Sequence, residues 1–234
     1  EADILIVNTC GFIDSAKAEA IGTYFTVEIL DETEKAMMEY ASNLYFGGEL
    51  VTDLVIPDGV TSIGSSAFNG CEKLTEVTLP ENMTAVPEYM FYFCPALEAV
   101  NLPDSVETIG DYAFKQCENL SVVNIGKGVY QIGYNPFYDC GQLTAIRVHA
   151  DNNYYSSDSY GALYEDEVFL LRVPAMLSGE FVIRDGTVGF DMETFWGCTE
   201  LTSVVVPGSV KVIPEAAFSE CYNLKTVTIN EGVE

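Results

Sequence analysis

A period of 23 residues runs through most of this 234-residue chain. Five segments begin 23 residues apart, namely VTDLVIP (51–57), LTEVTLP (74–80), LEAVNLP (97–103), LSVVNIG (120–126) and LTAIRVH (143–149). After one longer step of 35 residues the frame returns at Ser178, Leu201 and Leu224. A unit this short cannot bury its apolar side chains alone, so the repeat predicts a solenoid in which each coil packs against its neighbours.

Each unit contains the pattern L-x-x-V-x-I, then V-x-x-I, then A-F-x-x-C. Apolar residues two apart indicate a strand with one buried face, and the following Pro or Gly ends it. We expect the strands of successive coils to form a parallel sheet at a spacing of ~4.8 Å. V-x-x-I covers the next side of the coil, and A-F-x-x-C turns the chain back as a short helical or 3₁₀ turn. The fold class that follows is a β-rich solenoid.

These motifs resemble the BspA-like class of leucine-rich repeats over about residues 50–234. The resemblance implies a repeat module of bacterial surface or secreted proteins that binds other proteins and serves in adhesion. Two departures are local. The coil that begins at Leu143 is interrupted, and Thr194 replaces the usual Ala before Phe195.

Six of the seven cysteines form a column of the repeat: Cys71, Cys94, Cys117, Cys140, Cys198 and Cys221. Parallel side chains in successive coils do not suit a disulfide, so we expect buried, reduced thiols that act as small hydrophobes. No C-x-x-C pair supports a zinc site. His149 is the only histidine, and no Gly-x-Ser-x-Gly elbow accompanies it. We therefore predict no catalytic residue, no metal site and no cofactor.

The first 49 residues form a separate prediction, a short α/β segment ahead of the solenoid. Residues 2–21 resemble the N-terminal domain of radical-SAM methylthiotransferases, which implies that Cys10 matches an iron–sulfur ligand. The C-x-x-x-C-x-x-C motif of the radical-SAM domain is absent, and one thiol cannot hold a cluster. Residues 23–30 read as a strand and 31–41 as a helix, which either caps the first coil or belongs to a small separate α/β unit.

The longer step in the frame contains an insertion at residues 150–174. GALY and VFLLRV flank the short acidic stretch 165–167 and predict a β-hairpin. Before it, NNYYSSDSY is rich in Tyr, Ser, Asn and Asp, a mixture that is typical of adaptable recognition loops. The alternative is a decorative hairpin that hydrogen-bonds back onto the coil.

The charge limits the kinds of partner. Asp and Glu number 36 against 10 Lys and Arg, a net charge of −26, which repels nucleic acid and anionic lipid. No apolar run is long enough to cross a bilayer. We expect a cell-surface or secreted location. The last unit, from Leu224, lacks its second half, so we also expect a piece of a longer array whose open C-terminal repeat favours end-to-end self-association.

The strand residue before the last buried one gives an outward column: Val55, Thr78, Asn101, Asn124, Arg147, Val182, Val205 and Thr228. Beside it we expect positive charge and aromatic rings to meet. The predicted binding surface is Asn101, Asn124, Arg147, His149, Arg184, Tyr154, Tyr155, Tyr160 and Tyr164. Such a patch suits a partner that presents carboxylates, unless the arginines only neutralise nearby acids.

The function predicted from the sequence is therefore non-catalytic protein binding. Two alternatives stay open, a purely structural spacer and a fragment related to an iron–sulfur methylthiotransferase.

Overall fold

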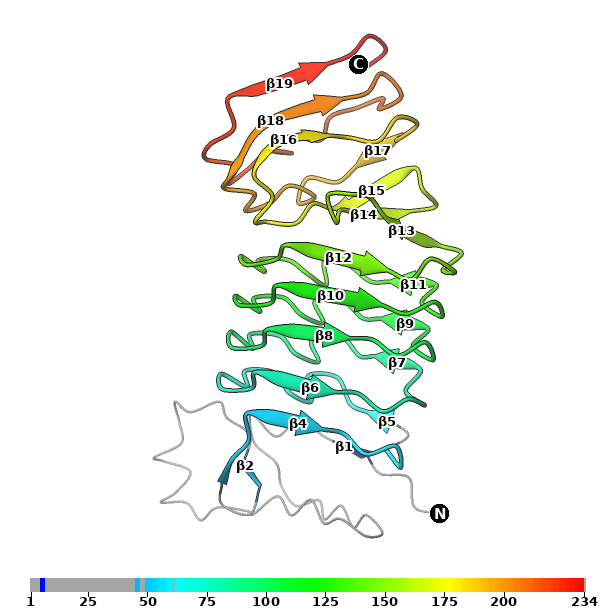
Figure 1. The fold of residues 1–234 in the computed structure, drawn as a ribbon, viewed down its shortest axis with the longest axis vertical. Coiled ribbons are helices and arrows are strands. Elements are labelled where there is room, and N and C mark those ends of the chain that lie inside the picture. The colour runs from blue at the N-terminus through cyan, green and yellow to red at the C-terminus, as the bar shows by residue number, and fades with distance from the viewer. Residues whose placement is uncertain (1–4, 7–44, 47–48, 61, 234) are drawn as a thin grey trace.

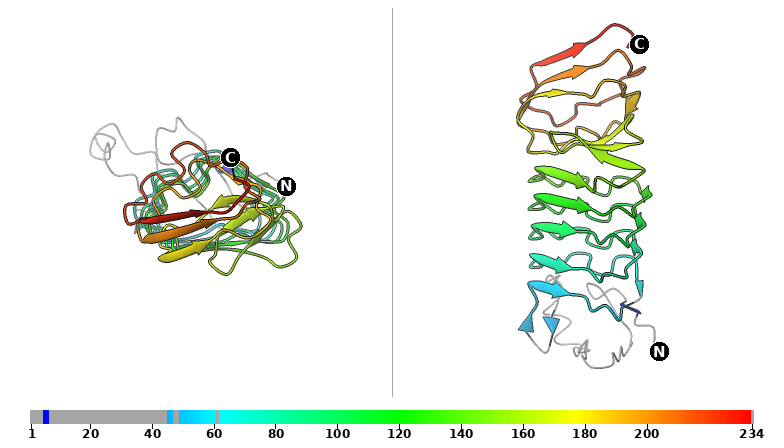
Figure 2. Two further views of the ribbon diagram at one scale, coloured as in Figure 1. Left: turned by 90° about the horizontal axis from the view of Figure 1, so that it is seen from above. Right: turned by 45° about the vertical axis from the view of Figure 1, so that its right-hand side comes forward.

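The computed structural model describes residues 5–6, 45–46, 49–60 and 62–233, and these build a stack of coils (Figure 1). No helix occurs in this part of the chain. Seen along the stack, the coils lie over one another, and from the side their strands form separate faces (Figure 2). Each coil therefore contacts the next one, as the 23-residue period predicts.

The first parallel sheet follows the L-x-x-V-x-I segments. Its order is β12–β10–β8–β6–β4, and the strands are β4 (Asp53–Val55), β6 (Glu76–Thr78), β8 (Ala99–Asn101), β10 (Val122–Ile125) and β12 (Ala145–Val148). The register advances by one repeat per strand, so Leu54 pairs with Val77 and Val123 pairs with Ile146. This confirms the predicted sheet.

A second parallel sheet follows the V-x-x-I segments. It is formed by β7 (Ala85–Val86), β9 (Thr108–Ile109) and β11 (Gln131–Ile132). On the same side, β5 (Ser62–Ile63) pairs in parallel with β1 (Leu5–Ile6). The short strands β2 (Tyr45–Phe46) and β3 (Glu49–Leu50) pair with each other in antiparallel fashion. Part of the N-terminal segment thus joins the sheet side of the first coil.

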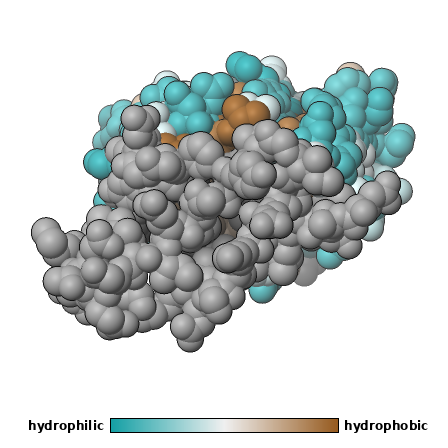
Figure 3. Space-filling model, turned by 90° about the horizontal axis from the view of Figure 1, so that it is seen from below, coloured by the Kyte–Doolittle hydropathy of each residue, from teal (hydrophilic) through white to brown (hydrophobic). Residues whose placement is uncertain are grey.

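The remaining N-terminal predictions lie outside the described residues. These are the ligand position Cys10, the strand at 23–30, the helix at 31–41 and the boundary near residue 49. Figure 3 shows the molecule from below, at the end of the stack where β1 and β4 lie. The described atoms visible there are mostly hydrophilic, with hydrophobic atoms between them.

The A-F-x-x-C segments are hydrogen-bonded turns, so the prediction of helical or 3₁₀ turns is wrong. Tyr112 and Gln116 have left-handed φ angles of 53° and 61°. Their N–H groups donate to the carbonyl oxygens of Tyr134 (3.0 Å) and Tyr138 (2.9 Å) in the next coil. In a helix these donors would bond within their own segment. Here the hydrogen bonds between coils stabilise a backbone conformation that a helix does not allow.

Phenylalanine and cysteine columns fill the interior. The rings of Phe68, Phe91, Phe114 and Phe137 stack with centroids 5.4, 5.5 and 5.7 Å apart. The six cysteines of the repeat column are buried, as predicted. They also donate hydrogen bonds, which the sequence did not indicate. The Sγ atoms of Cys94, Cys117 and Cys140 each lie 3.1 Å from the carbonyl oxygen of the phenylalanine in the preceding coil.

The insertion forms three antiparallel strands. They are β13 (Tyr155–Ser157), β14 (Leu163–Glu165) and β15 (Phe169–Arg172), and β14 pairs with both of the others. The predicted hairpin is confirmed as β14–β15, whereas β13 lies in a stretch that the sequence indicates as a loop. β15 then pairs in parallel with β17 (Gly189–Phe190), which returns the chain to the repeat.

The insertion also divides the molecule. Beyond it, β16 (Gly179–Val182), β18 (Leu201–Val206) and β19 (Thr226–Ile229) form a parallel sheet of their own. Successive residues of a strand face opposite sides. Accordingly, Leu163 of β14 belongs to the hydrophobic core of the first coils, and Tyr164 belongs to the core of the later coils. We call these the first and second stacks, and β14 is the wall between them.

Candidate protein-binding surface

The outward column predicted from the sequence lies on the exposed face of the first sheet. Val55 is 63% exposed, Thr78, Asn101 and Arg147 are exposed, and Asn124 is half-buried. The amide of Asn124 donates to Oδ1 of Asn101 at 2.5 Å, so the two form a short polar ladder. These residues follow one another in register across β8, β10 and β12.

The column does not run the full length of the chain. Val182, Val205 and Thr228 are in register with one another on β16, β18 and β19, which belong to the other sheet. The insertion therefore splits the predicted surface into two faces. The first is polar at Asn101 and Asn124, and the second is largely apolar, with Val182 42% exposed.

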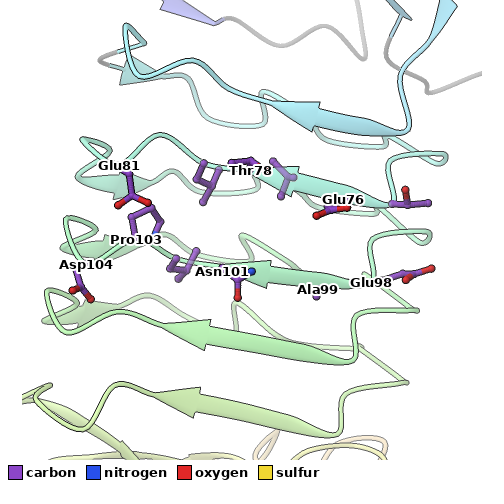
Figure 4. A pocket seen from close by; sticks show the side chains of 12 residues that line it. Glu76, Thr78, Glu81, Glu98, Ala99, Asn101, Pro103 and Asp104 are labelled. Carbon is purple, nitrogen blue, oxygen red and sulfur yellow. The ribbon is translucent and has the colours of Figure 1, made fainter.

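A groove of about 470 Å³ lies on the first face between β6 and β8 (Figure 4). Among the described residues these two strands pair at one register position, Glu76 with Ala99, whereas β8 and β10 pair at three. Glu76 and Glu98 lie at the end where the strands begin, and Glu81 and Asp104 lie at the other end (Figure 4). The groove is therefore acidic.

Asp104 is the groove carboxylate with a nearby cation. Lys127 Nζ lies 3.1 Å from its Oδ2, and the Lys127 N–H donates to its Oδ1. These hydrogen bonds, backbone first, hold the pKa of Asp104 below its usual range. Since both side chains are about half exposed, the ion pair contributes little to stability.

The positive patch predicted from the sequence is smaller in the structure. Arg147 and His149 are exposed on and just beyond β12. The Nδ1 atom of His149 accepts a hydrogen bond from the N–H of Asp151, whose carboxylate lies 3.9 Å away. Arg184 does not join them, because it donates to Ser156 Oγ (3.2 Å) and stacks over the ring of Tyr164, 4.2 Å from its centroid. The side chain of Arg184 thus contacts the insertion and not the β12 edge.

Two of the predicted surface tyrosines are buried, which corrects that part of the prediction. Tyr155 is 5% exposed, and its hydroxyl accepts the N–H of Ile132 at 2.9 Å. Tyr164 is fully buried, and its hydroxyl accepts the N–H of Arg184 at 3.4 Å. Burial raises the pKa of Tyr164 to about 12. Both rings pack the interior because β13 and β14 turn them inward.

The other two tyrosines differ in exposure. Tyr154 is 49% exposed and its ring lies 6.1 Å from that of Tyr130. Tyr160 is half-buried and packs edge-on against Phe181 at 5.1 Å. Of the nine predicted residues, those left on an open surface are Asn101, Asn124, Arg147, His149 and Tyr154. The groove acids Glu76 and Glu98 were not predicted from the sequence, although Glu76 lies two residues before Thr78 and so on the same outward face of β6.

Burial disfavours the thiolate form of three interior cysteines. Burial raises the pKa of Cys140 and of Cys198 to about 12, and that of Cys221 to about 11. A metal or cluster binds thiolates, which these sites disfavour. Over the described residues there is no group of three or more His, Cys, Asp or Glu that is placed to hold a metal ion. The same part of the chain contains no helix of the length and apolarity that a membrane span needs.

Residues 40–163 and 180–234 match the BspA type leucine rich repeat region, in six copies. This covers well over half of the sequence. The chain belongs to the BspA-type leucine-rich repeat family. The gap between the two matched parts falls on the insertion and the start of β16, where the structure departs from the repeat.

Two solved structures share the solenoid fold. The pneumococcal vaccine antigen PcpA superposes with a TM-score of 0.60 at 18% identity, covering 78% of this chain and 52% of that one. A leucine-rich repeat protein from Eubacterium ventriosum gives a TM-score of 0.58 at 22% identity, covering 78% and 61%. At these identities the likeness concerns the fold alone.

A different relative matches a shorter stretch. A ribosomal protein methylthiotransferase, RimO of Thermosynechococcus vestitus, is 37% identical over 68 residues. That stretch is 29% of this chain and 14% of the enzyme. The chain thus spans a small part of the enzyme and between half and two thirds of the two repeat proteins.

Proposed function

We propose that this chain is a non-catalytic protein-binding module of a bacterial surface or secreted protein, with an adhesion-like role. The observation that supports this proposal is the open face of the first sheet. Side chains of β6 to β12 project from it in register, with no described segment packed over Asn101 and Arg147, which are exposed. A rigid face with regularly spaced side chains is suited to recognise another folded surface.

The charges on this face define what a partner must offer. Carboxylates surround the groove between β6 and β8, while Arg147 and His149 are at the β12 edge. A partner that lies across the sheet therefore needs basic groups over the groove and acidic groups over Arg147. The net charge of −26 disfavours nucleic acid and anionic membranes as partners.

The experiment is affinity capture followed by a charge-matched comparison. The chain is immobilised, a partner is isolated from a host or bacterial surface extract, and its affinity is measured with purified components. We expect Arg147→Ala to weaken binding by more than about 1 kcal/mol, the threshold for a meaningful interface residue. Lys225→Ala removes an exposed cation that directly precedes β19 of the other sheet, and it is the control. Equal effects of the two variants would contradict the proposed surface, and the absence of any specific partner would favour a structural spacer.

A fragment related to a methylthiotransferase is the second candidate, favoured by the 68-residue match. We propose that this chain has no methylthiotransferase activity. An iron–sulfur cluster needs several thiolates, and six of the seven cysteines are buried in the solenoid. Anaerobic reconstitution followed by iron analysis tests this directly. Stoichiometric iron that disappears in Cys10→Ala would show that the enzyme-like stretch retains a cluster.

A further inference from the structure

Two groups of aromatic side chains, which Lys115 bridges, lie along the turn side of the solenoid. The rings of Tyr89 and Tyr112 lie 5.4 Å apart, those of Tyr112 and Tyr134 5.5 Å, and those of Tyr138 and Trp196 5.2 Å. Tyr134 is 50% exposed and the others are half-buried. We call this set, with Tyr92, the aromatic row: Tyr89, Tyr92, Tyr112, Tyr134, Tyr138 and Trp196.

The row crosses the insertion and is held from both stacks. The hydroxyl of Tyr134 donates to Oε1 of Glu193 at 3.1 Å. Beneath it, the buried Arg172 donates to the carbonyl oxygens of Glu193 (2.8 Å) and Trp196 (2.9 Å). The turn that presents Trp196 is therefore fixed against the coils that present the tyrosines.

Coil closure does not require these rings. Tyr89 and Tyr112 occupy the repeat position of Ser66 and Asn135, and all four have left-handed φ angles between 45° and 59°. A bulky side chain is disfavoured in that region, where Asn is well tolerated. Ser66 shows that the turn closes with a small polar residue. The rings at this position thus cost conformational energy, which is typical of residues kept for contact rather than for the backbone.

The surroundings of the row are acidic. Asp111, Asp139, Glu193 and Glu220 all act on its tyrosines, and desolvation together with these carboxylates raises the pKa of Tyr112, Tyr134 and Tyr138. Two cations, Arg172 and Lys115, lie near these carboxylates and partly offset their negative charge. Arg172 is buried, so an approaching molecule meets carboxylates and rings with Lys115 among them. The charge complementary to this surface is positive, as it is for the chain as a whole.

Lys115 shows how the row accommodates a cationic side chain. Its Nζ lies 4.8 Å from the ring centroid of Tyr112, 5.1 Å from that of Tyr138 and 5.8 Å from that of Tyr92. An ammonium or guanidinium group over or beside such rings gains a favourable electrostatic contact, and its aliphatic stem covers apolar ring surface.

We propose that the aromatic row is a second docking surface, and that its occupant is a polypeptide segment that carries arginine or lysine side chains. This inference rests on the proposed function of protein binding and adds a site that is separate from the sheet face. Tyrosine and tryptophan are the residues most often responsible for interface affinity, and arginine is their common counterpart. The carboxylates around the row accept hydrogen bonds from the ammonium or guanidinium groups of such a segment.

The test titrates the whole chain with a nona-arginine peptide at about 150 mM salt, where long-range attraction is screened. Trp196 is the only tryptophan and reports on the row by fluorescence. We expect a saturable change in its emission, and an affinity at least about fivefold lower in Tyr134→Ser, which leaves the net charge unchanged. Tyr130→Ser is the matched control, since Tyr130 is 46% exposed in the separate pair with Tyr154. It is expected to bind as the unmodified chain does.

Several results would overturn the proposal. The first is an equal affinity of the peptide for Tyr134→Ser and for the unmodified chain. The second is unchanged Trp196 fluorescence on addition of the peptide. The third is that the groove variant Glu98→Gln loses peptide binding while Tyr134→Ser keeps it. Glu193→Gln keeps the side-chain shape and repeats the test if Tyr134→Ser does not fold. Binding of the captured partner through Arg147 is measured in parallel. If that binding persists while the row fails, the proposed function stands and only this inference falls.

Discussion

The phenylalanine column packs differently in the two stacks. In the first, the rings from Phe68 to Phe137 are nearly parallel, with interplanar angles of 13–15°. In the second, the column rings of Phe195 and Phe218 meet at 53°, and Phe195 also meets Phe181 of β16 at 68°. Side chains of the insertion and the returning strand explain the change, because Tyr160 packs on Phe181 and Phe190 packs on Phe195. The column rings are therefore nearly parallel where regular coils stack, and they are tilted where side chains from outside the column pack on them.

The largest expected effect is on the regular stack. Phe114 is fully buried between two stacked rings, so Phe114→Ala should lower the free energy of unfolding by about 3–5 kcal/mol. Phe218 is half-buried and tilted, so Phe218→Ala should cost less. Urea unfolding monitored by circular dichroism compares the two variants. Equal costs would show that the difference in ring geometry has no energetic counterpart, and a cost near zero would remove Phe114 from the core.

The insertion between the stacks provides a matched pair of leucines, one on β14 and one on β15. Leu163 belongs to the first core and Leu170 to the second, and each is at most 1% exposed. Each Leu→Ala change should cost about 2–5 kcal/mol. Hydrogen exchange should rise in β10 and β12 for Leu163→Ala, and in β16 and β18 for Leu170→Ala. If either variant loosened both stacks equally, the cores would not be separate.

The sequence predicted the regular stack well because every coil repeats the same constraint. The 23-residue step determines which residues pair across the sheet, so the register of Leu54, Val77 and Val100 follows from it. The turns were predicted less well. Left-handed Tyr112 and Gln116 depend on carbonyl groups of the next coil, and side-chain identity does not indicate such contacts.

The insertion shows where the sequence was misleading. Its polar composition is typical of a recognition loop, yet Tyr155 and Tyr164 are core residues. The strands β13 and β14 are three residues long and show no alternation of buried and exposed residues, so no sequence pattern indicates which side chains are buried. Arg184 was assigned to the binding patch for the same reason, because its contact with Tyr164 requires the tertiary structure. The acidic groove depends on a local loss of strand pairing that no motif encodes.

In contrast to the rings, the buried thiols should behave alike in both stacks. Burial raises the pKa of Cys140 and Cys198 from 9.0 to about 12. Stability from a neutral buried thiol is complete below pH 9, where both states are protonated, and is lost as the pH rises toward 12. Each thiol then reduces the free energy of unfolding by up to about 1.4 kcal/mol per pH unit. Unfolding measured from pH 8 to 11 should have a shallower slope in Cys140→Ala and in Cys198→Ala. An unchanged slope would contradict the raised pKa.

The smallest expected effect concerns one hydrogen bond between the insertion and the first stack. Tyr155→Phe keeps the buried ring and removes the acceptor of the Ile132 N–H, which should cost about 1 kcal/mol. Tyr154→Phe is the control, since Tyr154 is exposed on the neighbouring position. Thermal unfolding distinguishes the two. A loss in Tyr154→Phe as large as that in Tyr155→Phe would argue against the assigned contact.

The central claim is that the insertion is a structural wall within a solenoid, and native-state hydrogen exchange of the unmodified chain tests it most directly. Exchange resolved to single segments should show β13, β14 and β15 protected to a degree similar to β10 and β12, because their backbone bonds and side chains lie between two cores. Rapid exchange across residues 150–174, with both neighbouring stacks fully protected, would show instead a loose loop attached to the solenoid and would contradict the account.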